Sequence, residues 1–214
     1  QAAIHVDGVQ GYLRVPFSFK ETKVDSYALS AHKIHGPKGV GALVLADGAR
    51  IKPIVAGGGQ QRGLRSGTEN TSGIAGMVAA VQSYPSDAME RMRGLKRLLL
   101  SLLTEALPET TVAGLPVDDP MSAGHILNVA LPPVRAETLL HALEADGICV
   151  GTGSACSSKK GRRSPVLTAM HLPPQVMDSA IRMSLCPFNT EEEMRYTAEK
   201  IIERVGQLRR FTRR

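Results

Sequence analysis

Residues 30–39 read SAHKIHGPKG, and upstream of them residues 7–10 read DGVQ. Each segment follows a short run of strand-forming residues that is bounded by Gly, Pro or charge, which is typical of strands in a sheet. Asp7 and Lys33 stand 26 residues apart, at the ends of two such runs. We therefore predict that Asp7 and Lys33 lie at the ends of neighbouring strands of one sheet.

Outward from these segments, hydrophobic periodicity predicts a mixture of strands and helices. Strands are expected at 2–6, 24–30, 41–46, near Val112, and at 126–131, 148–150 and 181–185. Helices are expected at 71–81, 136–143 and 191–208, and a long one after a capping box at Asp87 and Glu90. The pattern favours an α/β protein of two unequal lobes, one α/β and one α+β, that meet near Pro85.

Composition narrows the class of protein. The chain has 214 residues, of which 43% are apolar and none is Trp, so it is a globular protein and not a disordered, collagen-like or disulfide-built one. No apolar run approaches a membrane span. The three cysteines, Cys149, Cys156 and Cys186, fit no zinc spacing and cannot all pair, which favours a reducing compartment and a cytoplasmic location.

The net charge of +6 is concentrated at one end. Residues 204–214 contain five arginines and no acid, so the body of the chain is almost neutral. A basic tail is usually a solvated end, and because no aromatic platform for base stacking accompanies these arginines, a nucleic-acid partner is not expected.

Three polar clusters could perform chemistry: residues 7–10, residues 30–39, and residues 153–158, which read GSACSS. Each alone has an ordinary explanation as a turn, a surface segment or an inert loop thiol. Together they suit pyridoxal phosphate (PLP), because a lysine binds that cofactor covalently while an acid pairs with its pyridinium nitrogen.

These clusters, with three further motifs in the same order, resemble the cysteine desulfurases. This group of class V aminotransferases includes the iron–sulfur-cluster and nitrogenase-associated enzymes. The further motifs are GGGQQRGLRSGTEN at 57–70, LNV at 127–129 and IRMS at 181–184. The resemblance covers the C-terminal portion of the family. It implies the rear part of a fold-type I PLP-dependent large domain over residues 1–85 and a small C-terminal domain with a mobile cysteine loop over residues 86–214.

The resemblance also implies roles for individual residues. Lys33 matches the catalytic lysine that binds PLP and removes the substrate Cα proton, and Cys156 matches the nucleophile that attacks the substrate sulfur. The residues that match cofactor contacts are Asp7 at the pyridinium nitrogen, Gln10 at the ring hydroxyl, Ser30 and His32 at the phosphate, and Thr68 at the phosphate of a second subunit. Arg182 matches the arginine that binds the substrate carboxylate. No metal site is implied, and His5, His125, His141 and His171 are expected to be structural.

The sequence around the cysteines agrees with these roles. Cys156 follows glycines and precedes a basic stretch at 159–163, which favours a mobile loop and the reactive thiolate form. Cys149 and Cys186 stand in or beside apolar runs and are expected to be buried and inert.

The implied function is conversion of L-cysteine to L-alanine, with the sulfur left as a persulfide on Cys156 for iron–sulfur or thiolation pathways. A homodimer and a sulfur-acceptor protein, such as an iron–sulfur scaffold, are the implied partners. The family's front half is not matched, so the chain is expected to be a fragment that is inactive alone. An aminotransferase or selenocysteine lyase of the same fold, or a non-catalytic interaction module, are the alternatives.

Overall fold

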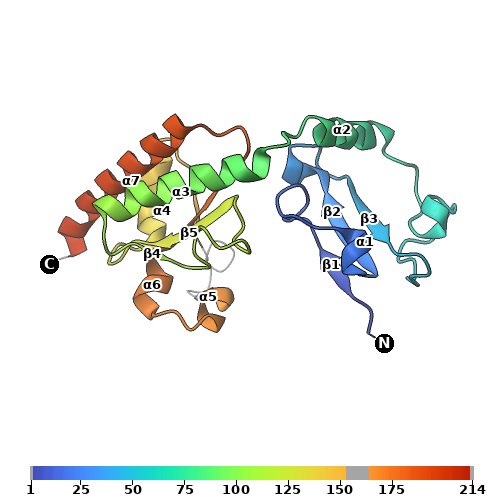
Figure 1. The fold of residues 1–214 in the computed structure, drawn as a ribbon, viewed down its shortest axis with the longest axis horizontal. Helices are drawn as coiled ribbons and strands as arrows, with labels where there is room; N and C mark the ends of the chain where they lie inside the picture. The colour runs from blue at the N-terminus through green and yellow to red at the C-terminus, as the bar shows by residue number, and fades with distance from the viewer. Residues whose placement is uncertain (1, 153–163, 213–214) are drawn as a thin grey trace. The chain divides into compact units, whose positions relative to one another are not determined.

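The computed structural model describes residues 2–152 and 164–212. The chain divides into two compact units, Gln1–Ser86 and Asp87–Arg214, which we call unit 1 and unit 2 (Figure 1). Over the described ranges, no helix combines the length and the apolar character that crossing a membrane requires.

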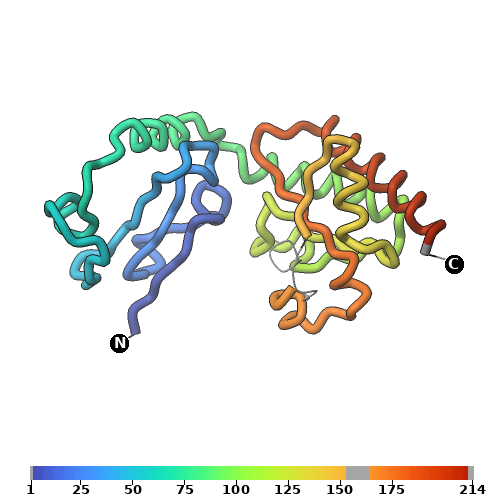
Figure 2. Tube along the Cα trace, turned by 180° about the vertical axis from the view of Figure 1, so that it is seen from behind, coloured from blue at the N-terminus to red at the C-terminus, as the bar shows by residue number. Residues whose placement is uncertain are grey.

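Unit 1 is built around a three-stranded sheet. Strand β1 (His5–Asp7) pairs in parallel with β2 (Ser26–Ser30), and β2 pairs antiparallel with β3 (Gly41–Leu45). The strand order is β1-β2-β3, so β1, near the N-terminus, forms one edge (Figure 2). The other elements are short helix α1 (Phe19–Thr22), the 3-10 turns η1 (Ala31–Ile34) and η2 (Gln61–Gly63), and helix α2 (Thr71–Gln82).

Helix α2 begins where its sequence provides a cap. The Asn70 side chain accepts a hydrogen bond from the Gly73 amide at 3.0 Å, which satisfies one of the free N–H groups of the first turn. Packing of α2 against η1 is close, because a Cβ at Gly76 would lie 2.6 Å from the ring of Pro37. The small residues of this helix therefore allow it to lie against the segment that contains Lys33.

Unit 2 contains a four-stranded antiparallel sheet in the order β4-β5-β7-β6. The strands are β4 (Thr111–Val112), β5 (Ile126–Ala130), β7 (Ala180–Ser184) and β6 (Gly151–Thr152). The helices are α3 (Ala88–Ala106), α4 (Ala136–Glu144), α5 (Pro165–Ala169), α6 (Pro174–Ser179) and α7 (Glu191–Thr212).

Alternation along β5 and β7 decides which side chains enter the core of unit 2. The odd-numbered residues, such as Leu127 and Ile181, are fully buried against the apolar stripes of α3, α4 and α7, which lie together beside the sheet (Figure 1). The even-numbered residues point to the opposite face. There, Ala130 and Ala180 pack against residues of α5 and α6, whereas Asn128 and Arg182 lie further along the strands.

The structure corrects several expectations about elements. The apolar run 148–150 is not a strand; pairing instead begins at Gly151. Asp87 precedes α3 without a capping hydrogen bond from its side chain, so the capping box expected with Glu90 is wrong. The box expected at the start of α7 is confirmed, since Thr190 and Glu193 exchange bonds of 2.9 and 3.2 Å.

Candidate functional site

Asp7 and the segment after β2 lie at the carboxyl ends of neighbouring strands in unit 1. Because β1 and β2 are parallel, with Asp7 opposite Ala28, the chain leaves both strands in the same direction. Asp7 is the last residue of β1, and Ser30 is the last residue of β2, immediately before the turn that contains Lys33. The predicted placement of Asp7 and Lys33 at neighbouring strand ends is therefore confirmed.

The turn after Asp7 depends on Gly8. A Cβ at this position would lie 1.9 Å from the ring of Tyr27, which stacks on Phe17 at a centroid distance of 4.6 Å. The Asp7 carboxylate accepts a hydrogen bond from the Val9 amide at 3.0 Å through Oδ1. Burial first, and then the nearby Tyr12 and Asp7, raise the pKa of Tyr27. The Tyr27 phenol therefore stays neutral beside this carboxylate.

The segment after β2 presents a hydroxyl, an imidazole and an amine in succession. Ser30 Oγ and His32 Nδ1 are joined by a hydrogen bond of 2.7 Å, and His32 is exposed. Lys33 follows, half-buried, in the 3-10 turn η1. The turn ends at His35, which adopts the left-handed region with φ of 66°.

Two residues missed by the sequence analysis surround this turn. Arg14 donates hydrogen bonds to Gln10 Oε1 at 3.2 Å and to the backbone carbonyl of Lys33. His35 lies near Arg14, and its pKa is lowered by burial first and by the positive charge of Arg14 second. No sequence motif marks Arg14, because its contact with the Lys33 segment is made with a backbone atom that is distant in the sequence.

Thr68 lies in a glycine-rich loop that is held together by two hydrogen bonds. The Ser66 amide donates to the Val55 carbonyl at 3.2 Å, and the Gly67 amide donates to Gln60 Oε1 at 3.0 Å. Between these bonds the chain passes through several residues with positive φ, among them Gln61 and Arg62, so its course is tightly folded. Thr68 itself is exposed.

Arg182 lies in unit 2, on the face of the sheet opposite the long helices. It is paired in register with Asn128 on β5 and with Gly151 on β6. A Cβ at Gly151 would lie 3.3 Å from the Arg182 guanidinium, so the glycine leaves room for the side chain. The Asn128 Oδ1 atom is buried and has no hydrogen-bond partner among the described residues, which leaves an acceptor on the same face as Arg182.

Cys156 lies outside the described residues, five positions after Gly151. The two other cysteines differ from the expectation that they are buried: Cys149 is exposed and Cys186 is half-buried. Ile148 and Val150 pack against the core, so Cys149 between them points outward. Among the described residues, no group of three or more His, Cys, Asp or Glu side chains could hold a metal ion.

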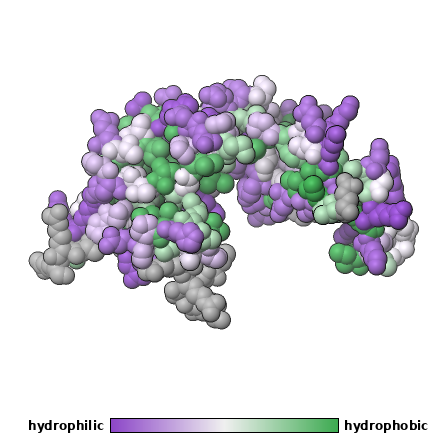
Figure 3. All heavy atoms as spheres, turned by 60° about the horizontal axis from the view of Figure 1, so that its bottom comes forward, coloured by the Kyte–Doolittle hydropathy of each residue, from purple (hydrophilic) through white to green (hydrophobic). Residues whose placement is uncertain are grey.

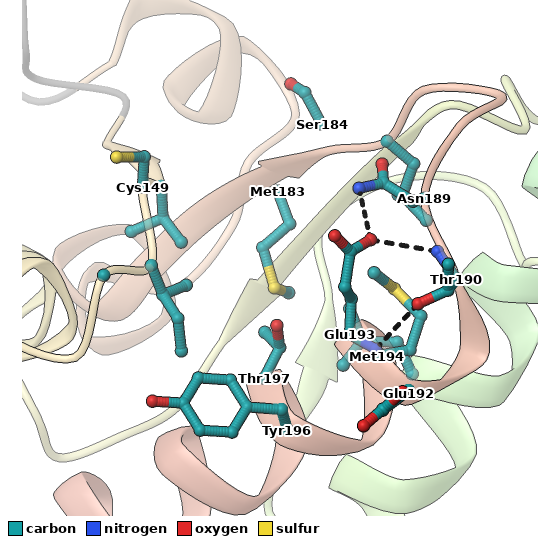
Figure 4. Close-up of a pocket in the computed structure, with 15 residues that line it drawn as sticks. Cys149, Met183, Ser184, Asn189, Thr190, Glu192, Glu193, Met194, Tyr196 and Thr197 are labelled. Atoms are coloured by element: carbon teal, nitrogen blue, oxygen red, sulfur yellow. Dashed lines mark hydrogen bonds between the residues drawn. The ribbon is translucent and has the colours of Figure 1, made fainter.

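An open cavity of about 450 Å³ lies in unit 2 beside Cys149, between β7 and the start of α7 (Figure 4). Its lining includes Met183 and Tyr196, together with Glu193, whose carboxylate bonds to Asn189 and to the Thr190 amide. None of the described site residues predicted from the sequence lines this cavity.

The family of the chain follows from comparison with known proteins. The model of the aminotransferase class-V family matches residues 1–196. The chain belongs to this family. It is similar to a cysteine desulfurase of Nostoc sp., with 36% identity over 97% of the chain and 52% of the relative, and to one of Enterobacter agglomerans, with 38% identity over 96% and 51%.

A solved structure of a NifS-like protein is also similar, at 39% identity and a TM-score of 0.83, over 97% of this chain and 53% of that one. The class-V family and this likeness confirm the predicted fold class, the rear part of a fold-type I enzyme with a smaller domain. The chain spans about half the length of the curated relatives it matches.

The residues at the edge of the sheet in unit 1 fit PLP by their chemistry. Asp7 offers a carboxylate for a ring nitrogen, and its Oδ2 has no hydrogen bond among the described residues. Lys33 offers a primary amine, while Ser30 and His32 form a joined pair of polar groups suited to phosphate. The donor set of this class-V chain is therefore compatible with the cofactor that the resemblance implies.

Proposed function

We propose that this chain supplies part of the active site of a PLP-dependent cysteine desulfurase. The observation that supports the proposal most strongly is the convergence of Asp7, Ser30, His32 and Lys33 at the ends of two adjacent parallel strands. Cysteine desulfurases among the relatives, at 36 and 38% identity, favour this function over that of an aminotransferase. The GSACSS segment agrees, because transamination needs no thiol.

In this proposal unit 1 holds the cofactor. Asp7 pairs with the pyridinium nitrogen, Gln10 lies near the ring hydroxyl, and Ser30 and His32 contact the phosphate. Thr68 contacts the phosphate bound by a second copy of the protein in a homodimer. When bound, PLP supplies an electron sink for the bonds at the substrate Cα. The Lys33 amine binds the cofactor covalently and later accepts the proton from that carbon.

Unit 2 holds the substrate and the sulfur. The Arg182 guanidinium, beside Gly151 and opposite Asn128, binds the carboxylate of L-cysteine with its planar pair of donors. The Cys156 thiolate attacks the sulfur of L-cysteine, the carbon–sulfur bond breaks, and its electron pair stays with Cβ, which takes up a proton. The products are L-alanine and a persulfide on Cys156, which an acceptor protein such as an iron–sulfur scaffold then receives.

The test uses the protein as its organism produces it, with whatever sequence flanks this chain. Release of L-alanine from L-cysteine and persulfide on Cys156 are measured for the wild type and three variants. Lys33→Ala is expected to abolish covalent PLP and turnover, and Arg182→Ala to keep PLP but raise the KM for L-cysteine. Cys156→Ser is expected to keep PLP and lose persulfide, because a hydroxyl is a far weaker nucleophile toward sulfur than a thiolate.

Each variant has a matched control nearby. Lys38→Ala removes an exposed lysine of the same segment, and Cys149→Ser removes the exposed thiol seven residues before Cys156. Both controls are expected to retain activity. Wild-type L-alanine production by Cys156→Ser, or loss of persulfide in Cys149→Ser alone, would contradict the assignment of the nucleophile.

The isolated chain of 214 residues is expected to bind PLP weakly or not at all, since it spans only half of its relatives. Titration of the chain with PLP, followed by absorbance, measures this directly. Tight stoichiometric binding by the chain alone would show that unit 1 needs no further residues to hold the cofactor.

A further inference from the structure

Arg14 lies one turn after Gln10 on a segment that coils immediately after β1. The Gly11 and Tyr12 amides donate to the Gly8 carbonyl at 2.9 and 2.8 Å, and the Arg14 amide donates to the Gly11 carbonyl at 2.9 Å. Residues four positions apart on such a coil face the same side, so Arg14 reaches the Gln10 amide oxygen. Arg14 is half-buried, although no pattern in the sequence marks it as part of a site.

The second contact of Arg14 provides a hydrogen-bond donor to the backbone of the turn that contains Lys33. The turn η1 spans only four residues and ends at His35, where φ of 66° reverses the chain. The His35 and Gly36 amides both donate to the Ala31 carbonyl, so the later carbonyls of the turn need donors from elsewhere. Arg14 Nη2 donates to the carbonyl of Lys33 and satisfies it with a charge-assisted bond.

We propose that Arg14 is a positioning residue that fastens the Gln10 segment to the backbone of Lys33. Its planar guanidinium makes the two contacts through Nη1 and Nη2, one to each segment. The distance between the Lys33 backbone and the Gln10 side chain is thereby set through Arg14. Only the functional meaning of that distance rests on the proposed PLP chemistry; the link between the two segments does not.

A lysine can replace this arrangement only in part. Its ammonium group is a single point on a flexible stem and does not hold two acceptors in a fixed relation, as the guanidinium fork does. The positive charge also reaches beyond the two bonds, since it contributes to the lowered pKa of His35 at the end of the turn. Arg14 therefore influences the Lys33 segment at both its backbone and its last residue.

The experiment compares Arg14→Met, Arg14→Lys and the control Arg50→Met in the protein as its organism produces it. Arg50 is exposed and lies outside this turn, so its loss changes the charge of unit 1 without changing the link. Hydrogen exchange is measured first, on protein stripped of cofactor. We expect Arg14→Met to raise exchange in residues 31–36 about tenfold, the scale of a charge-assisted hydrogen bond, while residues 41–45 change little.

The second readout uses PLP. Borohydride reduction followed by peptide mass spectrometry measures the fraction of PLP attached to Lys33, and the pH midpoint of the cofactor's visible absorbance reports the surroundings of the amine. We expect Arg14→Met to lower the trapped fraction and shift the midpoint, Arg14→Lys to restore both in part, and Arg50→Met to match the wild type.

The two readouts separate the inference from the proposed function. If the wild type takes up no PLP, the proposed function fails, and exchange in residues 31–36 alone decides whether Arg14 links the segments. Unchanged exchange in residues 31–36 of Arg14→Met would overturn the inference, because it would show that Arg14 does not hold this turn. An equal rise in residues 41–45 would also overturn it, because Arg14 would then stabilise unit 1 in general. A full return of both PLP readouts in Arg14→Lys would also overturn it.

Discussion

Unit 2 encloses a continuous apolar core, whereas unit 1 fully buries few of its apolar residues. In unit 2, β5, β7 and three helices enclose a continuous core that includes fully buried Leu139 and Ile201. The buried apolar residues of unit 1 are Val24, Tyr27, Leu29, Ala31 and Ile34. Its large exposed apolar residues are Ile4, Val15, Phe17, Leu43, Val44, Ile51, Ile54, Val55, Ile74 and Val78.

The unit with the larger core is therefore not the unit that contains Asp7 and Lys33, the residues proposed to hold the cofactor. Strand β3 contains Leu43 and Val44 at the surface, and Ile54, just before the glycine-rich loop, is 96% exposed. Apolar residues stand among hydrophilic ones on the surface of the molecule (Figure 3). We therefore expect unit 1, which holds Asp7 and Lys33, to gain less stability from its own core than unit 2 does.

The largest effect is expected when the units are separated. Residues 87–214 should fold alone and unfold cooperatively, because their core is complete within the unit. Residues 1–86 should not, because too little apolar surface is buried to offset the conformational entropy of the chain. Far-UV circular dichroism on heating measures both. A sharp transition in residues 1–86 alone would contradict the comparison.

Substitutions that shorten a single side chain should show the same contrast between the units with smaller effects. Leu139→Ala, at 0% exposure, should lower the free energy of unfolding of unit 2 by about 2–5 kcal/mol. Ile54→Ala, at 96% exposure, should change stability by less than about 0.5 kcal/mol. Urea unfolding followed by hydrogen exchange of each unit gives both values. A cost for Ile54→Ala as large as that of Leu139→Ala would show that the loop is buried in solution.

Local patterns predicted the elements whose stability is local. The apolar stripe of α3 and the Thr190–Glu193 box of α7 depend on residues three or four positions apart, so periodicity located both helices. The pairing of Gly151 with Arg182 depends on a strand 31 residues away, and the apolar run just before it was mistaken for the strand. The same error placed Cys149 in the interior.

The residues of the candidate site also differ in whether local sequence patterns could predict them. Asp7 and Lys33 could be placed from the sequence, because each follows a recognisable strand and parallel strands end at one edge. The role of Arg14 could not, because its acceptor is the Lys33 carbonyl, an atom that every residue possesses. The open acceptor of Asn128 opposite Arg182 likewise depends on strand register and not on residue type.

Two glycine substitutions should have opposite signs in the two units. Gly8→Ala places a Cβ 1.9 Å from the Tyr27 ring, so overpacking should destabilise unit 1 by about 1–3 kcal/mol. Gly94→Ala adds a Cβ within α3 with nothing inside 4 Å, and should stabilise unit 2 by about 0.5–1 kcal/mol. Denaturant midpoints of the two variants measure the signs. Stabilisation by Gly8→Ala would mean that Tyr27 has another position available.

The smallest expected effect is a difference in the pH at which each unit begins to lose stability. In unit 1 the pKa of His35 is lowered, mainly by burial and then by Arg14. In unit 2 the pKa of Asp146 is lowered, mainly by hydrogen bonds from Arg204 at 2.6 and 2.8 Å and further by the charges of Arg204 and Lys200. Each group is therefore easier to protonate in the unfolded chain than in the folded one.

Stability must fall with falling pH wherever the unfolded state binds more protons. For His35 this begins as the pH falls through its unfolded pKa of about 6.5, and for Asp146 only near its unfolded pKa of about 3.9. Hydrogen exchange of both units in one sample, corrected for intrinsic rates, should show residues 31–36 losing protection as the pH falls below about 6.5, while residues around Asp146 keep theirs until the pH approaches the unfolded pKa of Asp146.

Two variants isolate the groups responsible. His35→Asn retains a residue that tolerates positive φ and should remove the loss of protection near pH 6, and Arg204→Met should weaken the acid-side dependence of unit 2 alone. If His35→Asn leaves the profile of residues 31–36 unchanged, His35 is not the titrating group. Because Arg14 contributes to the shift at His35, Arg14→Met should move the same profile toward lower sensitivity, which joins the pH response of unit 1 to the link between Gln10 and Lys33.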